Sequence, residues 1–294
     1  MRVTHSLIAN TVIRNINRNL YRLNKYQDML SSGAAINKPS DDPVKITRIM
    51  GYATSLQQNE QYQRNLDAAE SWINTTEDAL AGMNDVLQRA RELAVSGADG
   101  TKPAEARQAI AMEIDELINV LVQLGNTSLG GRYIFAGHKT TTVPFERNPA
   151  GDVIYHGDQG AITWEIAPSV TINGNIAGQS LLVDTEIFRH LEDLVAGLNT
   201  NDSEAINQAL GALSDSIDVI LDKRAALGAI GKGLEITKNK TTLEELNLTK
   251  LRSQLEDIDF AETIMHFSTM DTLYRASLSA GARIMVPSLI DFLR

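Results

Sequence analysis

The sequence of 294 residues contains no cysteine and is poor in proline and aromatic residues. The absence of cysteine excludes disulfide bonds, cysteine metal ligands and a thiol nucleophile, and it leaves the redox compartment open. The 7 prolines leave residues 44–102 and 169–286 free of this helix breaker, so both ranges have room for very long helices. With 43% hydrophobic residues, the chain has enough apolar material for a sizeable core.

Long apolar runs and an excess of positive charge are also missing. No run of about 18 apolar residues could form a transmembrane helix, and residues 1–30 lack the continuous apolar segment of a cleavable secretory signal. The net charge of −10 argues against nucleic acid as the main partner, because phosphate binding needs a basic surface. We therefore expect no nucleic-acid or membrane partner and, for a role outside the cell, export without a cleavable signal.

Apolar residues at alternating spacings of 3 and 4 form a stripe in each terminal segment, as in coiled coils. Residues 1–30 carry five basic residues and one acidic residue, whereas residues 255–294 carry six acidic residues and three arginines. We expect these two helices to pair, with each other or with neighbouring copies. The predicted assembly positions are Ile13, Ile16, Leu20, Leu23, Leu30, Phe260, Ile264, Phe267, Tyr274, Leu278 and Met285.

Helical periodicity also fills most of the chain between these ends. A long helix is predicted from Val44 to about Ser96, with Asp42 as its N-cap and Pro43 at its first position. A shorter helix follows after residue 101, and another long helix runs through the C-terminal half from about residue 203. Its glycines each cost about 1 kcal/mol against alanine, a cost that close packing on a neighbouring backbone would justify. These glycines are Gly228, Gly231 and Gly233.

The middle of the chain changes in character, since nine of the 20 glycines fall between Gly125 and Gly178. Hairpin turns are expected at residues 148–152 and at Asn173-Gly174. The predicted strands are Arg132–Ala136, Thr140–Phe145, Val153–His156, Ala161–Ile166 and Val170–Ile172.

The predicted fold class is mainly α: a long antiparallel helical rod or coiled-coil bundle from both termini, with a small β-rich insertion domain in the middle. The short turns and matching stripes between successive helices favour this arrangement. The predicted segments are an N-terminal assembly helix and link (1–40), a long helical hairpin of the rod (41–130), a β-rich insertion (131–183), returning helices of the rod (184–254) and a C-terminal assembly helix (255–294).

Catalytic and metal-binding patterns are weak along the whole chain. No two of the five histidines have metal-ligand spacing on one helix face, although His138 and His156 could meet across strands. The pair Asp41-Asp42 fits a helix N-terminus better than an acid–base site. Residues 228–233 place a lysine among glycines but lack the serine or threonine of a phosphate-binding loop. We expect no enzyme activity, no cofactor and no metal.

Several stretches carry a likeness that spans nearly the whole chain. They are Leu30–Gly33 with Ile36–Pro43, Gly131–Gly137 with Pro144-Phe145, Arg224–Ile230 with Leu234-Glu235, and, near the end, Asp257, Asp259, Ala261-Glu262, Tyr274, Ala276 and Pro287–Leu289. Together they resemble the flagellin superfamily. The short, single β insertion and the ending Pro-Ser-Leu-Ile-Asp-Phe-Leu are more similar to the members at the hook–filament junction than to flagellin itself.

This resemblance implies a structural role in the bacterial flagellum, as a ring that adapts the hook side to the flagellin filament. The implied partners are further copies of this chain, hook-associated protein 1, flagellin and a flagellar export chaperone. Family members pass unfolded through the flagellar type III channel, so the implied location is the extracellular flagellum, reached without a cleavable signal peptide. The terminal helices of the family order on assembly, which suits a weak helix with a good apolar stripe.

Two other functions stay open at this point. A minor flagellin would form filament by itself, and a cytoplasmic coiled-coil adaptor would act inside the cell as a stable dimer. An enzyme hidden in the β insertion has no nucleophile–base pair to support it.

Overall fold

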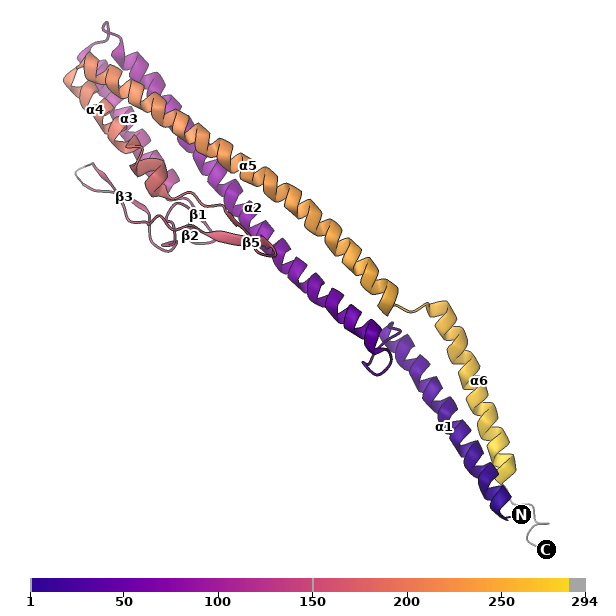
Figure 1. Ribbon diagram of the computed structural model, residues 1–294. Helices are drawn as coiled ribbons and strands as arrows, with labels where there is room; N and C mark the ends of the chain where they lie inside the picture. The colour runs from indigo at the N-terminus through magenta and orange to yellow at the C-terminus, as the bar shows by residue number, and fades with distance from the viewer. Residues whose placement is uncertain (1, 150, 286–294) are drawn as a thin grey trace. The chain divides into compact units, whose positions relative to one another are not determined.

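The computed structural model describes residues 2–149 and 151–285, and the side chains of residues 7–149 and 151–283. Contacts divide the chain into unit 1, residues 1–58 and 244–294, and unit 2, residues 59–243. The mainly α class with a β-rich insertion is confirmed (Figure 1). In chain order the helices are α1 (Arg2–Ser32), α2 (Pro43–Ala98), α3 (Ala104–Gly125), α4 (Ile187–Thr200), α5 (Ser203–Glu256) and α6 (Phe260–Met285), with a π-helical turn at Gln179–Val183.

Unit 1 consists of α1, α6, the start of α2 and the end of α5. Helices α1 and α6 lie side by side (Figure 1). They run antiparallel, because Tyr26 near the end of α1 stacks on His266 near the start of α6, while Gly281 near the end of α6 lies against Val12 and Ile16. Among the described residues of unit 1, the buried hydrophobic side chains are those of Ala34, Ile36 and Ile49.

One short segment separates α1 from α2 and another separates α5 from α6. Backbone hydrogen bonds connect these two segments to each other. Ala34 and Asp257 form an antiparallel β-bridge, in which Ala35 N donates to Glu256 O at 2.6 Å and Ile258 N donates to Gly33 O at 3.2 Å. Gly33 has a φ of +73°, as expected of the glycine after a helix C-terminus. We call residues 33–35 and 256–258 the joint of unit 1.

The helical part of unit 2 contains α3 and α4 together with most of α2 and α5 (Figure 1). The predicted antiparallel hairpin of α2 and α3 is seen in the ion pair between Arg89 and Glu113, whose nitrogen and oxygen are 2.8 Å apart. Helices α4 and α5 form a second hairpin, whose tight turn brings Gly197 against Ile206. Asp202 caps α5, since its Oδ1 accepts hydrogen bonds from the backbone N–H groups of residues 204 and 205.

Polar contacts line the antiparallel seam between α2 and α5 in unit 2. Arg224 donates from Nε and Nη2 to Glu77 Oε1, at 2.9 and 2.7 Å. Lys238 Nζ lies 2.8 Å from Asp67 Oδ1 and 2.7 Å from Glu70 Oε2, and these two carboxylates raise the pKa of the lysine. Polar pairs at defined positions along two long helices set their register, because apolar contacts alone specify the register weakly.

The described residues of the β insertion form three two-stranded antiparallel sheets. The ring of Phe145 is 1% exposed and lies against Tyr155 and Phe188, with ring centroids 5.0 and 5.8 Å away. Gly125 and Gly178 make room for this ring, because a Cβ on them would lie 2.7 and 2.6 Å from its atoms. The strands are β1 (Ser128–Leu129), β2 (Arg132–Tyr133), β3 (Phe145–Arg147), β4 (Val153–Tyr155), β5 (Thr163–Ala167) and β6 (Val170–Asn173).

Three predictions for this region are wrong. The strand predicted over Arg132–Ala136 ends at Tyr133, and residues 134–136 form a turn, in which Ile134 N donates to Thr127 O. Residues 140–144 form turns rather than a strand, because Thr142 N donates to Lys139 O and Pro144 has no N–H for a ladder; β3 begins only at Phe145. The hairpin turn between β5 and β6 lies at Pro168-Ser169, not at Asn173-Gly174, and Ser169 takes a φ of +60° there. The predicted turn over residues 148–152 does join β3 and β4.

Candidate assembly interface

The seam between α1 and α6 includes predicted assembly positions, such as Ile16, and residues beside them. Val12 and Ile16 approach Gly281, where a Cβ would lie 3.1 Å from a side-chain atom of each. The missing side chain of this glycine therefore lets the two helices pack closely at this point. Asn19 Nδ2 donates to Ser277 Oγ at 2.7 Å, one to two turns further along.

The structure divides the predicted assembly positions into two groups. Those half-buried in the chain are Ile16, Leu20, Leu23, Leu30, Phe267 and Tyr274. Those exposed, by 43% to 55% of the side chain, are Ile13, Phe260, Ile264 and Leu278. The side chain of Met285 lies outside the described residues, although its backbone ends α6. Four large apolar side chains thus form what we call the open flank of the α1–α6 pair: Ile13, Phe260, Ile264 and Leu278.

The opposite charges of the two ends do not meet as ion pairs between α1 and α6 within residues 7–149 and 151–283. The contacts across the seam are instead the Asn19–Ser277 hydrogen bond and the stack of Tyr26 on His266, whose ring centroids are 5.5 Å apart. His266 Nε2 lies 3.4 Å from Glu262 Oε1 on its own helix. Sequence reasoning missed Val12, which adjoins the predicted position Ile13, and the polar residues Asn19 and Ser277, which do not belong to an apolar stripe.

The link between α1 and α2 folds back on α1 through charged contacts. Lys25 Nζ lies 3.6 Å from Asp41 Oδ1. Loss of water alone would raise the pKa of Asp41, but the backbone N–H groups of Lys38 and Asn37 and the ammonium of Lys25 outweigh this effect and lower it. Asp42 caps α2 as predicted, since its Oδ1 accepts from the backbone of residues 44 and 45 at 3.0 Å. Both aspartates therefore have structural roles.

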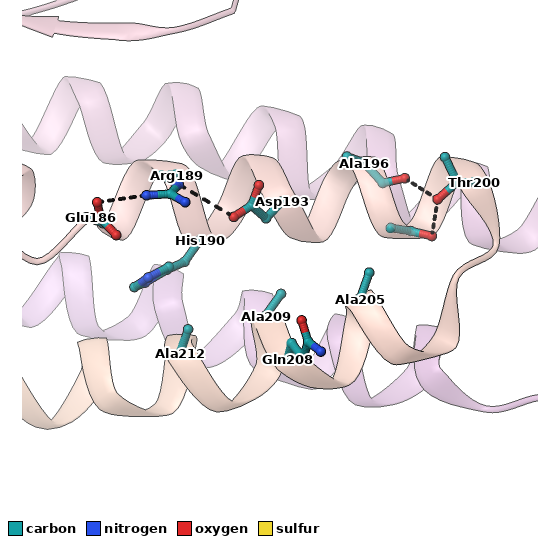
Figure 2. Close-up of a pocket in the computed structure, with 11 residues that line it drawn as sticks. Glu186, Arg189, His190, Asp193, Ala196, Thr200, Ala205, Gln208, Ala209 and Ala212 are labelled. Carbon is teal, nitrogen blue, oxygen red and sulfur yellow. Dashed lines mark hydrogen bonds and ion pairs between the residues drawn. The ribbon is translucent and has the colours of Figure 1, made fainter.

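A groove of about 510 Å³ lies between α4 and α5 in unit 2 (Figure 2). Its rim carries Arg189, which bonds Glu186 and lies near Asp193, and its floor is made of small residues. His190 Nδ1 lies 3.1 Å from Ser216 Oγ. This hydroxyl is buried and donates a hydrogen bond to Ala212 O of its own helix. It is therefore not placed to act as a nucleophile.

Other sequence candidates for chemistry are dispersed. His138 Nε2 bonds Ala161 O, whereas His156 pairs with Glu146. Residues 228–233 lie inside α5 rather than between a strand and a helix, so they are not a phosphate loop. Among the side chains of residues 7–149 and 151–283, no three histidine or carboxylate groups gather as a metal site would require. No helix in this described part of the chain is long and apolar enough to span a membrane.

Comparison with known families matches both helical ends of the chain. The profile of the bacterial flagellin N-terminal helical region matches residues 3–140, and that of the C-terminal helical region matches residues 210–293. These matches cover more than half of the sequence, so the chain belongs to the flagellin family and is a structural protein of the flagellum.

Within this family the chain is similar to hook-associated proteins and to flagellins. It is 28% identical to flagellar hook-associated protein 3 of Escherichia coli K12, with 95% of this chain and 96% of that protein covered. It is 26% identical to the flagellin of Bacillus subtilis 168, with full coverage of both. The crystal structure of flagellar hook-associated protein 3 from Legionella pneumophila shares the fold, with a TM-score of 0.62 at 17% identity, and covers 70% of this chain and 99% of its own.

Proposed function

We propose that this protein forms the junction ring between the hook side and the flagellin filament of a bacterial flagellum. The observation that carries the proposal is the open flank of α1 and α6 in a unit with almost no core of its own. Unit 1 devotes two long helices to a seam, yet its buried hydrophobic side chains among the described residues are few and lie in the link and in α2.

The energetics of the open flank favour self-association. Full burial of a large apolar side chain contributes roughly 1.5–3 kcal/mol, so covering the exposed half of Ile13, Phe260, Ile264 or Leu278 recovers about 1 kcal/mol each. Such gains offset the entropy of ordering two helices only when they recur along the whole length of the pair. A ring of identical copies supplies that repetition, because the terminal helices of every copy cover the open flank of one neighbour and have their own open flank covered by another.

The further parts of the proposal follow from family likeness. The partners are other copies of this chain, hook-associated protein 1 on the hook side, flagellin on the filament side and an export chaperone before assembly. The location is the extracellular flagellum, reached by export without a cleavable signal peptide. The role is mechanical rather than catalytic, in keeping with a structural family.

A second candidate is a minor flagellin that builds filament itself. Full-length similarity to the Bacillus subtilis flagellin at 26% identity supports it almost as well as the similarity to the hook-associated protein. The family match favours either flagellar role over a cytoplasmic coiled-coil adaptor.

Deletion of the gene in its own organism distinguishes these functions. The junction role predicts bare hooks by electron microscopy and flagellin released into the medium, with the protein placed at the distal end of the hook by immunogold labelling. Loss of filaments without released flagellin would identify the chain as the filament protein. Normal motile filaments in the deletion strain would refute both flagellar roles.

A pair of substitutions on α6 tests the open flank itself. Leu278→Asp places a charge on the flank, so we expect it to abolish assembly while unit 2 keeps its fold, because a buried unpaired charge costs several kcal/mol. Ser279→Asp adds the same charge one residue further along, outside the predicted stripe, and serves as the control. Normal filaments in a strain that carries Leu278→Asp would contradict the proposed interface.

A further inference from the structure

The side of α1 that is turned away from α6 carries a row of positive charge. Four basic residues follow one another at spacings of 4, 4 and 3, which places them on one face of the helix, and all four are exposed. This face lies away from Val12, Ile16 and Asn19, which contact α6, because successive residues are about 100° apart around a helix. We call these four residues the basic stripe: Arg14, Arg18, Arg22 and Lys25.

The basic stripe has little compensation within the chain. Arg18 and Arg22 form no ion pair with any side chain of residues 7–149 and 151–283. Lys25 Nζ lies 3.6 Å from Asp41 Oδ1, but the lysine is 45% exposed and such a pair contributes little. Like charges one turn apart repel each other and destabilise the helix that carries them. An acidic surface against this face would replace that repulsion by attraction.

Unit 2 carries the negative charge of the chain, with 26 acidic and 14 basic residues in its range 59–243. On α5, three exposed aspartates lie on one helix face at spacings of 3 and 4. None of the three joins an ion pair with a side chain that the structure describes. We call them the acidic stripe: Asp215, Asp218 and Asp222.

Small residues lie on the same face of α5, on both sides of the acidic stripe. Gly211 and Gly233 have no atom within 4 Å of the position where a Cβ would stand. The same holds for Gly228, and a Cβ on Gly231 would meet only a side-chain atom of Ile73 at 3.8 Å. The close packing that the sequence suggested for the glycines of α5 is therefore not found within the described residues. Small residues on an outward face let a helix of another molecule approach closely.

The two stripes match in spacing when the two helices run antiparallel. Forwards along α1 from Arg18, the basic residues are 4 and then 3 apart, and backwards along α5 from Asp222, the aspartates are also 4 and then 3 apart. A parallel arrangement aligns at most two of the three aspartates with basic residues, because the order of the spacings is then reversed. The antiparallel register forms three pairs: Arg18 with Asp222, Arg22 with Asp218, and Lys25 with Asp215.

The remaining positions of this register are compatible with close approach. Larger residues of α1 come opposite small residues of α5: Leu7 opposite Gly233, Thr11 opposite Ala229, and Arg14 opposite Ala226. The acidic residue within the helical part of this face, Asp28, comes opposite Ala212, so no like charges face each other. Charge, spacing and side-chain size therefore agree in one register.

We propose that the basic stripe of α1 in one copy of this chain binds the acidic stripe of α5 in a neighbouring copy, with the two helices antiparallel. The inference rests on the proposed function, since a ring needs a contact that recurs from copy to copy. The contact is head-to-tail, because each copy offers its basic stripe to one neighbour and its acidic stripe to another. It is separate from the open flank, whose residue Ile13 lies on a different face of α1.

Charge reversal tests the contact in the full-length protein. Arg22→Glu and Asp218→Lys each place like charges opposite one another, and we expect each to weaken self-association about tenfold in sedimentation velocity. The chain that carries both changes regains association, because the pair is restored with its charges exchanged. Arg48→Glu and Asp78→Lys, at exposed residues of α2 outside both stripes, serve as controls and leave association unchanged. Natural association in both single variants, or no recovery in the double variant, would overturn the contact.

Cysteine trapping tests the register, since the natural chain has no cysteine to interfere. Under mild oxidation, a mixture of Thr11→Cys and Ala229→Cys chains is expected to form disulfide-linked heterodimers, and a mixture of Thr11→Cys and Gly211→Cys chains is not. These three positions are exposed and leave the charged pairs intact. The reverse result would overturn the proposal, because residues 11 and 211 meet when the two helices pair parallel with Arg18 opposite Asp218.

The outcomes also separate this inference from the proposed function. If Leu278→Asp abolishes association while Arg22→Glu and Asp218→Lys leave it at the natural level, the contact between the stripes is wrong and the role of the open flank stands. If the unchanged protein stays monomeric at the highest concentration at which it is soluble, the contact is overturned, whereas bare hooks and released flagellin in the deletion strain would still support the junction role.

Discussion

Phe145 holds the β insertion against the helices of unit 2, and its removal should destabilise that unit strongly. The ring is 1% exposed, and it occupies space that Gly125 and Gly178 leave free. Its backbone is held as well, because Asn126 Nδ2 donates to Phe145 O at 2.8 Å and Asn126 Oδ1 accepts from Phe145 N at 2.9 Å. Side chain and backbone together place this residue where β3 begins.

The expected magnitude follows from the cavity that Phe145→Ala would leave. Replacing a fully buried phenylalanine by alanine costs about 3–5 kcal/mol, and the rings of Tyr155 and Phe188 cannot both move in to fill the space while β4 and α4 keep their places. For a unit of this size, such a loss lowers the midpoint of thermal unfolding by roughly 6–20 °C.

Thermal unfolding followed by circular dichroism measures this effect. The matched control is Ile154→Ala on the same hairpin, whose side chain is 44% exposed and whose loss should cost less than about 1 kcal/mol. If Phe145→Ala lowers the midpoint no more than Ile154→Ala does, the insertion is not held by this ring and the reasoning fails.

Three other properties can be measured on the same protein. The backbone N–H groups of His138 and Gly160 lower the pKa of Asp158 below its usual 3.8. The charged carboxylate therefore stabilises the folded protein fully above pH 3.8, and this contribution is lost as the pH falls through the lowered pKa. In thermal melts between about pH 5 and 3, acid should destabilise the natural protein more than it destabilises Asp158→Asn. Arg224→Met should cost about 1–2 kcal/mol in urea unfolding, because it leaves Glu77 without its ion-pair partner, and Glu77→Gln should reduce that cost when the two are combined; additive effects would refute the coupling. In dilute protein, amides of α1 and α6 should exchange within about tenfold of the unprotected rate and become protected on assembly, whereas equal protection of α1 and of the α2–α5 core without assembly would contradict the dependence of unit 1 on partners.

Much of the helical architecture was predictable, because long helices leave a periodic signal and their ends carry specific chemistry. The side chain of Asp42 caps α2, and Gly33 takes the positive φ that ends α1. The short strands were less predictable, since they are set by tertiary contacts rather than by alternation. β3 starts at Phe145 because that ring needs the space beside Gly125, and a Thr-rich run before it carries no such anchor.

The candidate interface shows a different limit of sequence reasoning. Val12 and Ile13 are adjacent and both apolar, and a stripe in one helix does not indicate which of two neighbouring rows faces the partner. Gly281 on the other helix decides it, because its missing side chain allows close approach at Val12 and Ile16 and leaves Ile13 outside. The residue that decides the matter, Gly281, was visible in the sequence, but it lies on the partner helix α6.

The joint of unit 1 also determines how mechanical force enters the protein. Each terminal helix is tethered covalently to its long helix by one strand of backbone, and a pull on α1 alone would load only the link after Ser32. The backbone bonds from Ala35 to Glu256 and from Ile258 to Gly33 connect the two tethers side by side. Tension or torque applied to either tail is therefore divided between two parallel load paths, and the bonds between them are sheared together rather than opened one after another. For a structural protein of the flagellum, this joint shares load at the place where its helices are interrupted.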